Sequence, residues 1–325
     1  GGPMFYIKNG MGPKFKWLGS LFAIFGILVA YFGIGTFAQV NSIVDITKMT
    51  IGLDPMWTAL ILTILVAAIT LGGLQSIASA AAKIVPAMAV IYFISTIGVL
   101  VYFADKVPAA IQTIVYSAFS GSAAAGGFLG ATVMLAMRNG IARGVFSNES
   151  GLGSAPIVAA AAKTKWPAEQ GLVSMTGTFI DTIVVCTMTG LSIVITGAWD
   201  MGLEGVSVTT KAFQIGLPFP EQVASFVLML CLVFFAFTTI LGWNYYSEKC
   251  LEYLVGDKKT VLKGYRWLYI LAVFIGPFMT VSAVWTIADI FNGLMAIPNM
   301  IALFALSGVI VKETKAFFAA EKHKM

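Results

Sequence analysis

The chain has 325 residues, of which 58% are hydrophobic and 11% are charged, and its mean hydropathy is +0.89. This composition excludes an ordinary soluble domain and is typical of a polytopic, all-α membrane protein. The net charge of +5 does not indicate nucleic-acid binding, because the basic residues cluster in short loops between apolar segments.

Histidine catalysis and histidine metal sites are excluded, since the only histidine, His323, lies in a charged tail. Cys186, Cys231 and Cys250 lack the spacing of a metal site, so we interpret them as packing residues. We therefore expect no cofactor, and the lipid bilayer rather than nucleic acid as a partner.

Residues 1–325 are predicted to form a single transmembrane domain. The chain begins with Gly-Gly-Pro, without an initiating Met or a signal peptide. We therefore expect it to be N-terminally incomplete.

Apolar stretches of about 20 residues, the length that crosses a bilayer, predict eight spans. Their approximate ranges are 17–39 (with helix possible to 46), 56–74, 84–104, a broken span within 126–162, 171–198, 223–246, 267–287 and 290–311. Residues 106–120 are too short to cross and predict an interfacial helix. Residues 199–221 contain a helical patch near 206–215 and form either an outer lid or a passive loop.

The basic residues are distributed unevenly between the two sides of this arrangement. Of the 20 Lys and Arg residues, 15 fall on the side that carries both chain ends. The positive-inside rule then places both ends in the cytoplasm of a multi-pass plasma-membrane protein.

The broken span is predicted from residues 143–163. Gly151 and Gly153 disfavour a continuous helix, Ser154 suits an N-cap, and Pro156 suits a first helical turn. We expect a helix that stops, an irregular polar segment at the bilayer midplane, and a second half-helix over 155–163. A rival break, Gly126-Gly127 and Gly130, lacks polar side chains and ranks second.

Such a break can bind a zwitterion. The N–H groups at the start of the second half-helix suit a carboxylate, and the C=O groups at the end of the first suit an ammonium or a small cation. Alternatively, neighbouring helices satisfy the break as a simple kink. The candidate substrate-binding residues here are Phe146, Ser147, Asn148, Glu149, Ser150, Gly151 and Gly153.

Polar residues inside other spans are further candidates. Asp181 could pair with Arg138 or Arg143, bind a cation, carry a proton, or act only as a structural acceptor. Thr238 and Thr239 either supply oxygen ligands to a hard cation or bond their own preceding carbonyls. Gln39 either faces the cavity or lies at the membrane interface, and Trp243 either walls a small pocket or simply packs.

Five motifs resemble the alanine/glycine:cation symporter family, and the resemblance covers the whole chain. They are GGPMFYI (1–7), RGVFSNESGLGSAP (143–156), FIDTIVVC (179–186), AFTTILGW (236–243) and FNGLMAIP (291–298). The second and fourth are long enough to be specific.

The resemblance implies a leucine-transporter type of fold, in which two inverted repeats each begin with a helix broken at the midplane. It implies that the first span here is the third helix of that fold and that the first two helices are absent. It further implies that residues 146–153, Gln39 and Trp243 surround an amino acid, and that Thr238 and Thr239 bind sodium.

The resulting hypothesis is cation-coupled symport of alanine or glycine. Proton coupling through Asp181 or Glu149 is an alternative, as is a passive channel. A receptor that binds amino acid without moving it is a further rival. An enzyme is disfavoured, because no nucleophile–base pair or metal cluster is evident within the spans.

Overall fold

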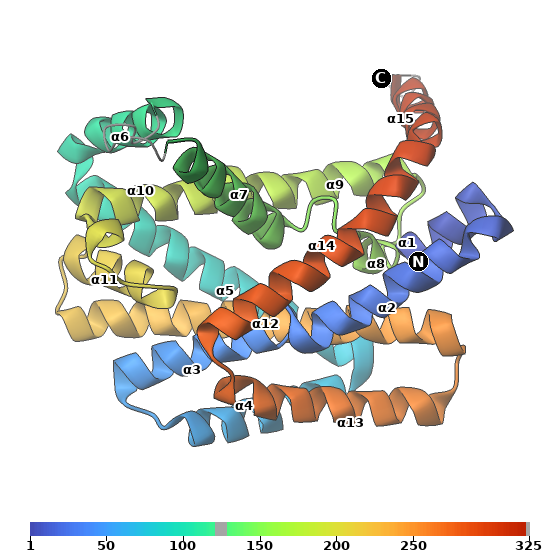
Figure 1. The fold of residues 1–325 in the computed structure, drawn as a ribbon, viewed down its shortest axis with the longest axis horizontal. Coiled ribbons are helices and arrows are strands. Elements are labelled where there is room, and N and C mark those ends of the chain that lie inside the picture. Colours follow the sequence, from blue (N-terminus) through green and yellow to red (C-terminus); the bar gives the residue numbers. More distant parts are fainter. Residues whose placement is uncertain (121–128, 323–325) are drawn as a thin grey trace.

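The computed structural model describes residues 1–120 and 129–322, and every regular element among them is helical. Several of the long helices run along one common direction while others cross them obliquely, and both chain ends lie toward the same side of the bundle (Figure 1). The prediction of a polytopic helical membrane protein is confirmed.

Helices of different lengths make up the bundle. In chain order they are α1 (Pro3–Tyr6), η1 (Ile7–Met11), η2 (Pro13–Phe15), α2 (Lys16–Phe32), α3 (Phe37–Ile51), α4 (Pro55–Thr70), α5 (Gly73–Tyr102), η3 (Ala104–Lys106), α6 (Val107–Ser120), α7 (Leu129–Asn148), α8 (Ala155–Ala159), α9 (Pro167–Phe179), η4 (Ile180–Cys186), α10 (Thr187–Thr196), η5 (Ala198–Asp200), α11 (Val206–Gly216), α12 (Glu221–Val255), α13 (Lys259–Ile275), η6 (Gly276–Phe278), α14 (Val281–Ala305) and α15 (Ser307–Lys322). The helices expected at 106–120 and 206–215 are both present.

The predicted count of eight spans is not supported. Six helical runs in the described part of the chain are long and apolar enough to cross a membrane. The second predicted span corresponds to α4, which has only 16 residues, and the fourth is divided between α7 and α8.

The boundary between the last two predicted spans was wrong. The chain turns at Gly276–Phe278, and α14 begins at Val281 rather than near residue 290. Pro277 starts the short 3-10 turn, and Thr280 is extended. Met279 and Val281 keep the local sequence apolar, so hydropathy alone does not reveal the turn.

The first predicted span, expected as one continuous helix, is interrupted between α2 and α3. The Thr36 hydroxyl donates to the carbonyl of Ala30 at 2.5 Å, which satisfies a group that the interruption leaves free. The Tyr269 hydroxyl, from α13, donates to Ile240 O at 2.8 Å and approaches Gly35 O at 3.4 Å. Neighbouring helices therefore hold this break in place.

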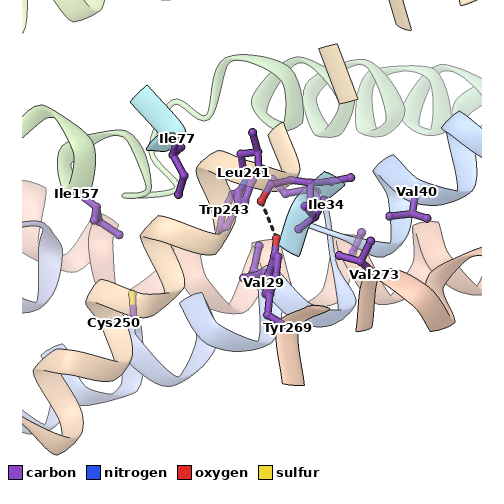
Figure 2. Close-up of a cluster of buried hydrophobic side chains, with 14 of the residues drawn as sticks. Val29, Ile34, Val40, Ile77, Ile157, Leu241, Trp243, Cys250, Tyr269 and Val273 are labelled. Carbon is purple, nitrogen blue, oxygen red and sulfur yellow. Dashed lines mark hydrogen bonds between the residues drawn. The ribbon is translucent and has the colours of Figure 1, made fainter. Parts of the chain in front are cut away.

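Helix α12 lies at the centre of the packing and contacts α2, α3 and α5 along its length. Figure 2 shows Trp243 and Leu241 of this helix beside Val29 and Ile34 of the first span, with Tyr269 next to them. This cluster brings the interruption at 33–36 against Trp243.

Gly35 is predicted to be intolerant of any side chain. A Cβ at this position would lie 2.7 Å from Ala30 Cα and 2.8 Å from Trp243 Cβ. We expect Gly35→Ala to destabilise the protein by about 1–3 kcal/mol, because overpacking strains a close-packed core. Thermal unfolding of the purified protein in detergent measures this. Gly242→Ala is the matched control, since nothing lies within 4 Å of its Cβ position; equal melting shifts for the two variants would contradict the prediction.

Candidate functional site

The break predicted at residues 143–163 is present. Helix α7 ends at Asn148, and Glu149 follows with φ of 56°, the only non-glycine residue with positive φ in the described chain. Gly151 and Gly153 have φ of 81° and 92°. A non-glycine residue in this region costs roughly 1–2 kcal/mol, so surrounding contacts must hold Glu149 there.

The second half-helix is shorter than predicted, and Ser154 occupies its N-cap position without capping it through the side chain. Helix α8 has five residues rather than the nine expected, and Ser154, just before it, has helical φ and ψ. Its hydroxyl instead donates to Glu149 Oε2 at 2.7 Å. So short a helix has little dipole, so the predicted carboxylate site at its N-terminus is not supported.

The Gly151–Ser154 part of the break faces protein rather than a cavity. Asn299 of α14 donates from Nδ2 to Gly151 O at 2.8 Å, and the Tyr6 hydroxyl donates to Asn299 Oδ1. A Cβ on Gly153 would lie 2.7 Å from Pro3 Cγ. In this part of the segment, neighbouring residues supply a backbone hydrogen bond and close packing.

Ser147 and Asn148, at the end of α7, form a polar cluster with the fifth predicted span. The Ser147 hydroxyl is 2.9 Å from each carboxylate oxygen of Asp181, and Asn148 Nδ2 donates to Thr182 Oγ1 at 2.9 Å. Thr182 also donates to Asp181 at 3.2 Å. Two candidate groups identified separately in the sequence are thus a single cluster.

The Asp181 side of this cluster lies on irregular helix. Residues Ile180–Cys186 form a π-helical turn between α9 and α10. Such insertions are uncommon and frequently mark functional positions, because they redirect side chains and loosen backbone hydrogen bonds. This geometry supports Asp181 as part of a site rather than a passive acceptor.

An open cavity of about 380 Å³ adjoins the cluster. It lies between the break and α9, and its lining is mostly small or polar: Asn148, Ala155, Val158, Ala159, Ala162, Gln170, Ser174, Thr178 and Tyr246. Of the predicted substrate-binding residues, Asn148 therefore borders open space.

The predicted pairing of Arg143 with Asp181 is not present. Its guanidinium binds both carboxylate oxygens of Asp289 on α14. It also lies over two aromatic rings, with Cζ 4.7 Å from the centre of Trp285 and 5.1 Å from that of Phe146. The two rings are themselves 5.0 Å apart. This group, which we call the Arg143 clamp (Arg143, Phe146, Trp285 and Asp289), joins α7 to α14. Arg138, the other predicted partner of Asp181, makes no ion pair among the described residues.

The remaining candidates lie on α3 and α12. Gln39 is half-buried on α3. Trp243 is only 2% exposed, and its indole N–H lies near the Glu149 carboxylate without a hydrogen bond of ordinary length. Thr238 and Thr239 donate to carbonyls of their own helix, at 2.9 Å and 3.0 Å to Phe235 O. Of the rival break, Gly126 and Gly127 lie outside the described residues, whereas Gly130 lies within α7.

Several residues at the site were missed in the sequence. Asp289 lay between two predicted spans, so its carboxylate was not counted as intramembrane. Asn299 follows Pro298 within α14 and was hidden in an apolar run. The Gly33–Thr36 segment carries the same signal as the main break, two glycines and a hydroxyl in an apolar helix, yet residues 17–39 were predicted as one continuous span.

The comparisons with known proteins agree with this architecture. Residues 1–325 match the sodium:alanine symporter family over their whole length. The chain belongs to this family. It is therefore a membrane transport protein rather than an enzyme, and the resemblance identified from its motifs is confirmed.

Several relatives align with nearly the whole length of this chain. The chain is 52% identical to an uncharacterised transporter of Haemophilus influenzae, over 98% of this chain and 69% of the relative. It is 46% identical to the sodium/alanine symporter AgcS of Methanococcus maripaludis, over 100% of this chain and 70% of the relative. It is 35% identical to the amino-acid carrier protein AlsT of Bacillus subtilis, over 99% of this chain and 67% of the relative. The chain thus spans about two thirds of the length of these relatives.

The Arg143 clamp should contribute measurable stability. A double-mutant cycle with Arg143→Gln and Asp289→Asn is expected to give a coupling energy of about 1 kcal/mol, since half-exposed ion pairs are weak but two flanking aromatic rings add to this one. Thermal unfolding in detergent supplies the four free energies. The matched pair is Lys211–Glu221, whose charged atoms are 3.8 Å apart and for which we expect less coupling. Equal couplings for the two pairs would show that the aromatic rings add nothing.

Proposed function

We propose that this protein takes up small neutral amino acids, alanine and glycine, across the plasma membrane in symport with sodium. The family match supports this, as do the names of AgcS and AlsT. The observation that carries the proposal is the break at Glu149–Gly153, joined to Asp181 through Ser147 beside an open cavity.

The proposed amino-acid site surrounds the end of α7. The carbonyl of Gly151 already accepts from Asn299, so ligand contacts fall on the Ser147–Ser150 side of the break. The final carbonyls of α7 have no helical partner and attract an ammonium group. Phe146, Gln39 and Trp243 are the proposed walls; Gly151 and Gly153 give the backbone its shape.

The proposed sodium ligands are Thr238 and Thr239. Each hydroxyl donates its hydrogen to a carbonyl of α12, but a hydroxyl oxygen that donates keeps lone pairs to offer to a cation. The hydrogen bonds therefore orient these oxygens without preventing coordination. Sodium and amino acid would each have to favour one conformation, since coupling requires differential binding.

We further propose that the chain adopts the inverted-repeat arrangement of the leucine-transporter type, with both ends in the cytoplasm. The break at Glu149–Gly153 supports this arrangement, because it lies in the span that would begin the second repeat. The excess of Lys and Arg at the end of the bundle that carries the termini supports the orientation.

Removing the hydroxyl of Thr239 is expected to raise the sodium concentration for half-maximal alanine uptake about tenfold, because one oxygen ligand is lost. Uptake into proteoliposomes containing the full-length Thr239→Ala protein measures this. Thr63→Ala is the matched control, since Thr63 makes the same type of bond within α4, to Ala59 O at 2.7 Å. If the two variants show the same sodium dependence, Thr239 is not a ligand.

Proton coupling is the second candidate, because Asp181 is a carboxylate within a span and a Bacillus subtilis relative, 34% identical, is named a putative sodium/proton-dependent alanine carrier. Under sodium coupling, Asp181→Asn should weaken alanine uptake severalfold while leaving its sodium requirement in place, since the hydrogen bond from Ser147 persists to the amide oxygen. Uptake driven by a pH gradient without sodium in the unaltered protein, and lost in Asp181→Asn, would instead establish proton coupling.

A further inference from the structure

A second cavity, of about 270 Å³, lies away from the break, between the start of α5 and the helices α12 and α13. It is near the end of the bundle where the chain passes from α12 to α13. Its lining is rich in polar and charged groups: Thr70, Gly73, Ile77, Asn244, Tyr245, Glu248, Lys249 and Arg266. None of these residues belongs to the amino-acid or sodium site proposed above.

Asn244 is the unexplained residue of this cavity. Its side chain is 1% exposed, and its amide nitrogen has no hydrogen-bond partner. Leaving a buried donor unpaired costs roughly 1–3 kcal/mol, so such groups in native proteins call for a partner. Rotation about the last torsion of Asn244, which has broad minima, turns this donor toward the cavity that the residue lines.

Thr70 donates its hydroxyl hydrogen to Val66 O, and the charged groups of the lining retain more free donors than acceptors. Glu248 accepts two hydrogen bonds from Arg266, each of 2.7 Å, so its carboxylate is occupied. Lys249 Nζ donates one of its three N–H groups to Glu252 Oε2 at 2.6 Å, and Glu252 does not line the cavity. Gly73 begins the 30-residue helix α5, whose first N–H groups have no helical partner and carry the positive end of its dipole.

We propose that this cavity binds a small carboxylate. It is lined by Asn244, whose amide donor is unpaired, by two cationic side chains and by the first residue of α5, and the one carboxylate among its described lining residues is already paired. If the proposed function holds, the carboxylate belongs to the transported amino acid at the basic end of the bundle. Asn244 directly follows Trp243 on α12, so this site is next to the wall of the amino-acid site. A free carboxylate of another origin has the same chemistry.

Acetate is the simplest probe, and titration of the purified full-length protein, followed by tryptophan fluorescence or calorimetry, tests the site without requiring transport. We expect Asn244→Ala to weaken acetate binding about fivefold, and Asn244→Asp to weaken it more, since the new carboxylate repels the ligand. Lys249→Gln should weaken binding two- to threefold. Lys259→Gln is its control, because Lys259 lies at the same end of the bundle outside the cavity.

Glu248→Gln gives the sharpest test, because the proposal predicts that this substitution increases the affinity for acetate. Removing the negative charge frees Arg266, so acetate should bind about threefold more tightly. General damage to the cavity would weaken binding instead, and either weaker or unchanged acetate binding in Glu248→Gln overturns the proposal. The proposal is also overturned if methylammonium competes with acetate as effectively as alanine does.

Alanine distinguishes the two sources of carboxylate. If the amino acid uses this site, alanine competes with acetate, and Asn244→Ala raises the KM for alanine only when the basic end of the bundle faces the substrate. Acetate binding without alanine competition overturns the amino-acid assignment and leaves a site for another carboxylate. Failure of sodium-driven alanine uptake in the unaltered protein overturns the proposed function without affecting the acetate result.

Discussion

The arrangement of this bundle depends on how it satisfies backbone groups that its broken helices leave unpaired. Within hydrocarbon, each unpaired N–H or C=O costs several kcal/mol, so a break persists only where other parts of the protein supply partners. At the main break, Asn299 donates to Gly151 O, and at the first break Thr36 donates to Ala30 O. These bonds fix α14 against the main break, and α2 against α3.

Both breaks meet at α12. Gly35 packs so closely on Trp243 that no side chain would fit between them, and the Trp243 indole lies near the Glu149 carboxylate. A shift of α12 relative to either broken helix would therefore disturb both irregular segments. Close-packed contacts of this kind have discrete arrangements rather than a continuous range, which suits a protein that alternates between two conformations.

The sequence was sufficient to predict the helical membrane class, the main break and each polar candidate singly, because these follow from composition, from glycine and from charge within apolar runs. It could not predict the partners. Ser147 and Asp181 are 34 residues apart, and only packing brings them together. The early end of α8 and the turn at Gly276–Phe278 lie in apolar sequence, so hydropathy does not reveal either of them.

The three carboxylates near the main break differ in the groups that donate hydrogen bonds to them. Asp289 is neutralised by Arg143, which binds both of its oxygens. Asp181 accepts hydrogen bonds from Ser147 and Thr182, and Glu149 accepts one from Ser154, so their described hydrogen-bond donors are neutral hydroxyls. A cation that approached Asp289 would have to displace a guanidinium, whereas at Asp181 and Glu149 it would meet only hydroxyl donors. The Arg143 clamp therefore joins α7 to α14, while Asp181 and Glu149 are the carboxylates whose partners a bound ion could replace more easily.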